Sequence, residues 1–147
     1  TGVAMTNAVL QHQHCIVRCE VEKPYRDPYL VQEWLKTIIY SLGMKPMYGP
    51  VARYCWTRGN RGVTGFAIIE TSHVAVHIWD EPNPALVQFD VYTCGAFKPE
   101  LILEHLDSMT PVKMEYKWLD RENNLTELEH YKDKGNESIN TKSNSKT

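Results

Sequence analysis

The chain has 147 residues, of which 42% are hydrophobic and 23% are charged, with a formal net charge of -2 and a pI near 6.3. This length is enough for one domain with a substantial core but too short for two. The balanced charge gives no basic surface for nucleic acid, and no apolar run is long enough to span a bilayer. We therefore expect one globular domain that binds neither nucleic acid nor a membrane.

The apolar patterns predict mainly extended segments, interrupted by two helices. In chain order we expect a strand at 12–21, a helix at 28–42, an extended segment at 46–56, strands at 63–70, 73–79 and 86–93, a helix from residue 99 and a strand at 112–119. Asp27 and Pro28 suit the N-cap and first position of the first helix, and Gly43 suits its end.

This order of elements predicts an α+β fold. We expect a two-layer sandwich in which an antiparallel sheet carries both helices on one face. The other sheet face would then lack a cover, so we expect a homodimer that packs sheet to sheet. Residues 1–131 would form the single domain. From Lys132 onward the chain is polar apart from Ile139, and we predict a disordered tail over 132–147 because it cannot bury enough apolar surface.

The four cysteines, Cys15, Cys19, Cys55 and Cys94, form no CxxC pair, and residues 1–6 show no secretory signal. A disulfide framework is therefore not expected, and we predict a cytoplasmic protein with free thiols. One of these thiols could then have a chemical rather than a structural role.

Three side chains between residues 62 and 95 could carry chemistry, although each is ordinary by itself. Ser72 lies between two extended segments, where most serines are only hydrogen-bonding residues. His77 lies on a Val-rich strand, where most histidines belong to the core, and Cys94 is typical of a small buried hydrophobe. Their information lies in their combination and spacing.

The combination comprises Gly62-Val63-Thr64-Gly65, Ser72-His73, His77, Trp79 and Asp90-Val91-Tyr92-Thr93-Cys94-Gly95. It resembles the prokaryotic S-adenosylmethionine decarboxylase family, whose pattern runs Gly-Val-Ser-Gly, Glu-Ser-His, His-Thr-Trp-Pro-Glu and Asp-Leu-Phe-Thr-Cys-Gly. The spacing from the first hydroxyl to the processed serine and on to the histidine matches without gaps.

The resemblance implies a proenzyme that cleaves itself between Thr71 and Ser72. In this family the processed serine attacks the preceding carbonyl, and the resulting ester breaks down to leave a pyruvoyl group in place of the serine. Because peptide bonds cleave slowly, the backbone must be strained and the oxyanion stabilised. By the resemblance, Thr64 supplies a helping hydroxyl and His77 acts as the processing base.

The implied activity is decarboxylation of S-adenosylmethionine, which supplies the aminopropyl donor for spermidine biosynthesis. The pyruvoyl ketone derived from Ser72 forms a Schiff base with the substrate and accepts electrons as carbon dioxide leaves. Cys94 is the expected proton donor, because a thiol can give a proton near neutral pH. Family members use aromatic side chains to hold the adenine, and by this resemblance Trp56 or Tyr54 is a candidate for that contact.

Two departures from the family pattern leave alternatives open. Thr71 stands where the family has Glu, and Arg18 stands where the family has an acidic residue, four places after the residue aligned here as His14. One alternative is a pyruvoyl-dependent ornithine or arginine decarboxylase on the same fold. The other is a regulatory homologue that does not process itself.

A metal site is not expected from the histidines. His73 and His77 would point to the same face of a strand but lie roughly 13 Å apart, which is too far for two ligands of one ion. The pyruvoyl group is therefore the only cofactor that we predict.

Overall fold

The computed structural model describes residues 11–134 and 137–142. Its strands are β1 (Gln13–Val21), β2 (Pro46–Cys55), β3 (Gly62–Ile69), β4 (Ser72–Trp79), β5 (Ala85–Thr93), β6 (Pro111–Asp120), β7 (Thr126–Lys134) and β8 (Glu137–Lys142). Its helical elements are α2 (Pro28–Ser41), α3 (Pro99–Leu103) and the 3-10 helix η1 (Glu104–Met109). None of the helices in the described residues is long and apolar enough to cross a membrane.

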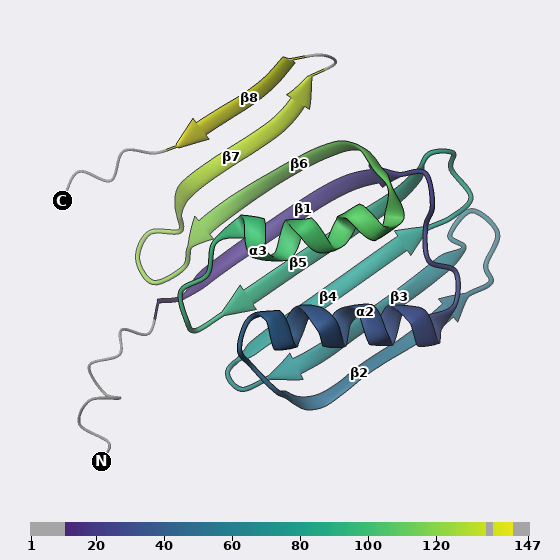
Figure 1. The fold of residues 1–147 in the computed structure, drawn as a ribbon, viewed down its shortest axis with the longest axis horizontal. Coiled ribbons are helices and arrows are strands. Elements are labelled where there is room, and N and C mark those ends of the chain that lie inside the picture. Colours follow the sequence, from purple (N-terminus) through teal and green to yellow (C-terminus); the bar gives the residue numbers. More distant parts are fainter. Residues whose placement is uncertain (1–10, 135–136, 143–147) are drawn as a thin grey trace.

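The strands form one eight-stranded sheet in the order β2-β3-β4-β5-β1-β6-β7-β8. Every neighbouring pair is antiparallel. Helices α2 and α3 lie over the same face of this sheet (Figure 1). The predicted α+β architecture, with an antiparallel sheet and its helices on one side, is confirmed.

Helix α2 forms where its cap and its apolar stripe require it. The Asp27 side chain accepts a hydrogen bond from the Tyr29 backbone N–H at 2.9 Å, which caps the first turn. The buried side chains recur at helical spacing, and Trp34 packs 5.1 Å from the ring of Phe89 on β5. This contact ties the helix to β5, while its main contacts are with β2 and β3, so α2 covers the β2 side of the sheet.

Strand alternation separates two sheet faces. The helix-covered face holds the apolar core, including Val17, Val74, Val76, Phe89 and Val91. Their neighbours in sequence point to the other side, which we call the open face. On the central strands the open face consists of His14, Ile16, Arg18, Glu20, Thr64, Phe66, Ile68, His73, Ala75, His77, Trp79, Leu86, Gln88, Asp90 and Tyr92.

The open face is partly apolar although no described element covers it. Ile16, Phe66 and Ile68 remain 43%, 41% and 44% exposed. Exposed apolar groups on one face are typical of a surface that meets another protein. These exposed side chains suit a surface that packs against another protein. The homodimer that packs sheet to sheet stays a prediction.

The predicted disordered tail from Lys132 is wrong for part of its length. Strand β7 continues to Lys134, and β8 pairs with it from Glu137 to Lys142, so the sheet extends beyond residue 131. The prediction weighed only the burial of side chains. An edge hairpin can instead satisfy its backbone groups by pairing with the preceding strand, here β6. Residues 1–10, 135–136 and 143–147 lie outside the described part of the chain.

Candidate active site

The turn between β3 and β4 is short and strained. Ile69 pairs directly with Ser72, so Glu70 and Thr71 alone connect the two strands. Thr71 has a φ of 50°, in the left-handed region. A β-branched residue there costs about 1–3 kcal/mol, because its Cβ crowds the backbone. The peptide bond between Thr71 and Ser72 therefore follows directly on a strained residue.

Cys94 contacts both residues of that bond. Its backbone N–H donates to the Ser72 hydroxyl oxygen at 3.1 Å, and its sulfur lies 3.8 Å from the same oxygen. The Thr71 hydroxyl oxygen lies 3.0 Å from the Cys94 sulfur and 2.8 Å from the Glu70 carbonyl oxygen, and it can donate its one proton to either of them. Ser72 is only 6% exposed, so these contacts hold its hydroxyl in a nearly dry environment. Although 22 residues separate them in the chain, Ser72 and Cys94 thus form one site.

An open pocket of about 570 Å³ lies beside these residues. Its walls are Gly43, Met44, Lys45, Pro46, Met47, Ile69, Glu70, Thr71 and Cys94. The volume is in the range of pockets that hold small-molecule ligands. Because Cys94 is part of the wall, a small molecule in this pocket would contact Cys94.

Thr64 and His77 form a second pair, away from this site. They are cross-strand partners on β3 and β4, and the Thr64 hydroxyl lies 3.1 Å from Nδ1 of His77. Five residues separate Ser72 from His77 along β4, which places the two side chains on opposite faces and roughly 16 Å apart. The structure of this chain therefore does not bring Thr64 and His77 to Ser72.

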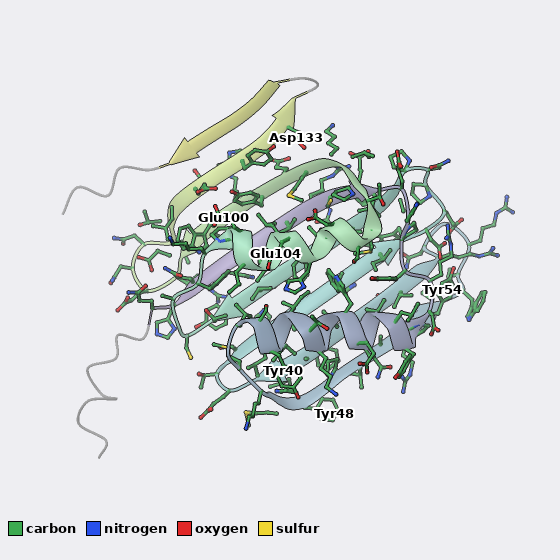
Figure 2. All side chains as sticks on the ribbon, in the orientation of Figure 1. Tyr40, Tyr48, Tyr54, Glu100, Glu104 and Asp133 are labelled. Atoms are coloured by element: carbon green, nitrogen blue, oxygen red, sulfur yellow. The ribbon has the colours of Figure 1, made fainter. Side chains whose placement is uncertain are left out.

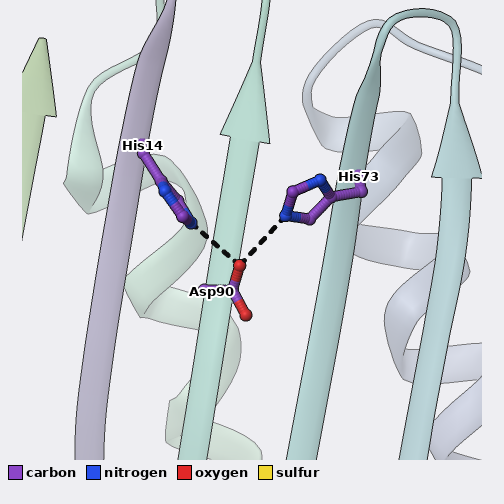
Figure 3. Close-up of side chains that lie close together, drawn as sticks. All are labelled: His14, His73 and Asp90. Atoms are coloured by element: carbon purple, nitrogen blue, oxygen red, sulfur yellow. Dashed lines mark hydrogen bonds and ion pairs between the residues drawn. The ribbon is translucent and has the colours of Figure 1, made fainter. Parts of the chain in front are cut away.

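Three further side chains meet on the open face beside the turn (Figure 3). One carboxylate oxygen of Asp90 lies 2.8 Å from Nε2 of His14 and 3.2 Å from Nε2 of His73. An ionised carboxylate only accepts hydrogen bonds, so both imidazoles donate to it. Burial raises the pKa of Asp90, but the hydrogen bonds from His14 and His73 outweigh burial and hold that pKa below its usual range.

The sequence motif contains His73 and Asp90 but does not reveal that they meet, and His14 lies outside it. The signal that could have found them is the alternation along each strand. Asp90 lies between buried Phe89 and Val91, His73 precedes buried Val74 and His14 precedes buried Cys15, so each points to the open face. Their meeting depends on the order of β4, β5 and β1 in the sheet, which adjacent sequence does not specify.

Comparison with known proteins identifies the family. Residues 13–122 match the family model described as S-adenosylmethionine decarboxylase, which covers most of the chain. The chain belongs to the S-adenosylmethionine decarboxylase family. The resemblance inferred from the motif is thereby confirmed.

Individual members of the S-adenosylmethionine decarboxylase family match over shorter stretches. The S-adenosylmethionine decarboxylase proenzyme of Synechococcus sp. (strain WH7803) is 45% identical over 47 residues, which are 31% of this chain and 35% of that protein. The proenzyme of the same name from Pyrobaculum arsenaticum is 38% identical over 64 residues, 42% of this chain and 50% of its own. The one from Archaeoglobus fulgidus is 50% identical over 34 residues, 23% and 29% of the two chains. The matched stretches thus span half or less of these relatives.

Trp56, the candidate adenine contact in this decarboxylase-family chain, lies far from Ser72. It is 75% exposed and packs 4.3 Å from the ring of Tyr54. Cys55, next to it, pairs with Gly62 at the start of β3, whereas the turn at Thr71 follows the end of β3. Tyr54 marks this end of the sheet in Figure 2. Trp56 therefore shares an end of the sheet with the Thr64–His77 pair.

His14, His73 and Asp90 are also the one group of three potential metal ligands found in the described residues. A metal-bound histidine normally donates the N–H of its other ring nitrogen to an acceptor. Nδ1 of His14 instead lies 3.3 Å from the guanidinium of Arg121, which can only donate. This polarity suits a hydrogen-bonded network in which His14 accepts from Arg121 and donates to Asp90, and it does not suit a metal ligand.

The surroundings of the four cysteines predict two reactive and two inert thiols. Cys15 and Cys19 have no exposed surface, and burial raises the pKa of Cys19 to about 12. Cys55 and Cys94 are partly exposed. Because the thiolate is the reactive form, we expect Ellman's reagent at pH 8 to label two thiols rapidly in the folded protein and all four after unfolding. Cys94→Ala should lower the rapid count to one; rapid labelling of all four would contradict the burial.

Proposed function

We propose that this chain is a self-cleaving, pyruvoyl-dependent decarboxylase that acts on S-adenosylmethionine and so supplies the aminopropyl donor for spermidine biosynthesis. The observation that carries the proposal is the contact of Cys94 with both residues of the Thr71–Ser72 bond, at a strained turn beside a pocket. Membership of the family supports the choice of substrate.

Cleavage would begin with attack of the Ser72 hydroxyl oxygen on the carbonyl carbon of Thr71. The Thr71–Ser72 C–N bond breaks as the ester forms, and the hydroxyl proton passes to the freed nitrogen. Loss of the Cα proton of residue 72 then breaks its Cβ–Oγ bond, which releases Thr71 as a carboxylate and leaves a dehydroalanine. Its imine tautomer reacts with water to give the ketone and ammonia. The strained φ of Thr71 favours the first step, because breaking the peptide bond relieves the turn.

In the decarboxylation, the residues around Ser72 would position the substrate and deliver a proton. The pyruvoyl ketone, once made, supplies an electron sink for the pair left behind by carbon dioxide. The Cys94 sulfur, 3.8 Å from the Ser72 oxygen, lies within reach of the α-carbon of a substrate that is joined through its amine to residue 72. Its thiol would protonate that atom. The pocket beside Cys94 would admit the substrate from solvent.

We assign Thr64 and His77 to the processing of a second protomer. One protomer holds them roughly 16 Å from Ser72 along β4. The open face that carries them also exposes Ile16, Phe66 and Ile68, as expected of a surface covered by another copy. A two-fold, sheet-to-sheet dimer would bring the Thr64–His77 end of one open face over the Thr71–Ser72 turn of the other. The partner's pair would meet the backbone of that turn, because the Ser72 side chain itself points to the helix-covered face. Trp56 would reach the substrate from the partner in the same way.

Complementation between two inactive variants tests this shared site. His77→Ala lacks the base and Ser72→Ala lacks the nucleophile, so each should remain intact when expressed alone. Co-expressed with different tags and purified as a heterodimer, the His77→Ala subunit should be cleaved, because its partner supplies His77. Mass spectrometry of each tagged subunit gives the result. A heterodimer that stays intact, or unimpaired cleavage of His77→Ala alone, would overturn the assignment.

The first measurement for the function itself is an intact mass spectrum under denaturing conditions. We expect two fragments, residues 1–71 and residues 72–147, with the second blocked at its N-terminus by the pyruvoyl group, in place of one 17.0 kDa species. Release of carbon dioxide from S-adenosylmethionine, ornithine and arginine then identifies the substrate. If the protein stays intact on long incubation, it is a regulatory homologue. If carbon dioxide is released from ornithine or arginine alone, that amino acid replaces S-adenosylmethionine as the substrate.

A further inference from the structure

Cleavage between Thr71 and Ser72 would change what holds the first residues of β4. Before cleavage, the turn ties Ser72 covalently to β3. Afterwards residue 72 begins a chain, and a pyruvoyl group has no backbone N–H with which to pair. Chain ends fray unless other contacts tie them down. His73 then becomes the first residue of β4 with a complete backbone and a side chain that can anchor the new end.

The side chain of His73 is anchored across three strands. It donates to Asp90 on β5 at 3.2 Å, and Asp90 accepts from His14 on β1 at 2.8 Å (Figure 3). Tyr92 pairs with both histidines in the sheet, and its ring lies 5.6 Å from that of His73 and 5.9 Å from that of His14. Hydrogen bonds to an ionised carboxylate are stronger than those between neutral groups.

The network continues to a cation at the edge of the open face. Arg121 donates to Nδ1 of His14 at 3.3 Å and lies 4.4 Å above the ring of Tyr92. Because a guanidinium can only donate, this contact favours the tautomer of His14 in which Nδ1 accepts and Nε2 donates to Asp90. The hydrogen bonds from Arg121 to His14 and from His14 to Asp90 thus hold the carboxylate that anchors His73.

We propose that Asp90 is a positioning residue that clamps the cleaved end of β4, through His73 and His14, so that residue 72 stays against Cys94 after the turn is cut. The inference rests on the proposed cleavage at Ser72. Before cleavage the turn does the same task, so the clamp matters only in the processed protein. Catalysis is sensitive to small displacements between the cofactor and the group that protonates the substrate. Loss of the clamp should therefore lower kcat more than it raises KM.

Asp90→Asn tests the clamp in two backgrounds, because it removes the charge and keeps the shape. In the processed protein, hydrogen exchange at residues 73–76 should become about tenfold faster, and kcat should fall about tenfold with KM within twofold. In a Ser72→Ala background, where the turn remains covalent, Asp90→Asn should leave exchange at these residues within twofold. Glu20→Gln, which removes another ion-paired carboxylate of the open face, is the matched control and should change neither quantity.

The possible outcomes separate the clamp from the proposed function. Equal acceleration of exchange in both backgrounds would make Asp90 an ordinary support of the sheet and overturn the clamp. An Asp90→Asn protein that no longer cleaves would also overturn it, because the network would then act before the cut. If wild-type protein itself stays intact, the proposed function fails and the clamp falls with it.

Discussion

Ser72→Ala is expected to abolish both self-cleavage and decarboxylation. The variant lacks the only oxygen that can attack the Thr71 carbonyl from residue 72, and without cleavage the chain makes no pyruvoyl group. Activity should fall by at least about a thousandfold, to the background of the assay, because the electron sink is missing rather than misplaced. The fold should survive, since Ser72 contributes one small side chain at the edge of the core.

Intact mass and release of carbon dioxide, measured on the same preparation, check this prediction. Ser108→Ala is a suitable control, because Ser108 is an exposed serine whose hydroxyl donates to the nearby His105 carbonyl. It should cleave and turn over like the wild type. Two fragments from the Ser72→Ala protein would show that the cleavage site lies elsewhere, and a decarboxylase activity without cleavage would require another cofactor.

Cys94→Ala is expected to separate processing from turnover. The backbone N–H that holds the Ser72 oxygen remains in the variant, so a measurable fraction of the chain should still cleave. The thiol that protonates the substrate is lost, and removal of a general acid lowers the rate by about 10²- to 10⁴-fold. We therefore expect turnover per cleaved chain to fall by about a hundredfold or more.

The measurement counts cleaved chains by mass spectrometry and divides the rate of carbon dioxide release by that number. Cys55→Ala provides the control, because Cys55 is also a partly exposed thiol. It pairs with Gly62 at the start of β3, whereas Cys94 contacts the turn that follows the end of β3. Unchanged turnover per cleaved Cys94→Ala chain would remove Cys94 from the mechanism. Complete failure to cleave would assign the thiol, and not only the backbone, to processing.

Much of the fold follows from local pattern. The alternation of apolar residues predicted β1 and β3 to β6, and the cap at Asp27 with its apolar stripe predicted α2, because each of these signals is contained within a short stretch of chain. The hairpin of β7 and β8 was missed for the same reason. The hairpin is held by backbone pairing with β6, and the pattern of hydrophobic residues in the sequence does not indicate such pairing.

The candidate site divides in a similar way. The motif pointed to Ser72 and Cys94, and the structure brings them within hydrogen-bonding distance. It also pointed to His77, which is five residues from Ser72 on the same strand. Because side chains alternate along a strand, this odd spacing places His77 on the opposite face of the sheet. The Asp90 network was missed because its three members come from strands that are adjacent only in the folded sheet.

By itself, the sequence determined the family resemblance, the type of most elements and the spacing of the motif, because these are properties of residues close together in the chain. The tertiary structure alone decided that Cys94 meets Ser72, that His77 does not, and that Asp90 joins His14 to His73. The reason is physical. Which strands become neighbours depends on burying one apolar face under the helices, and this is settled by the whole sheet at once.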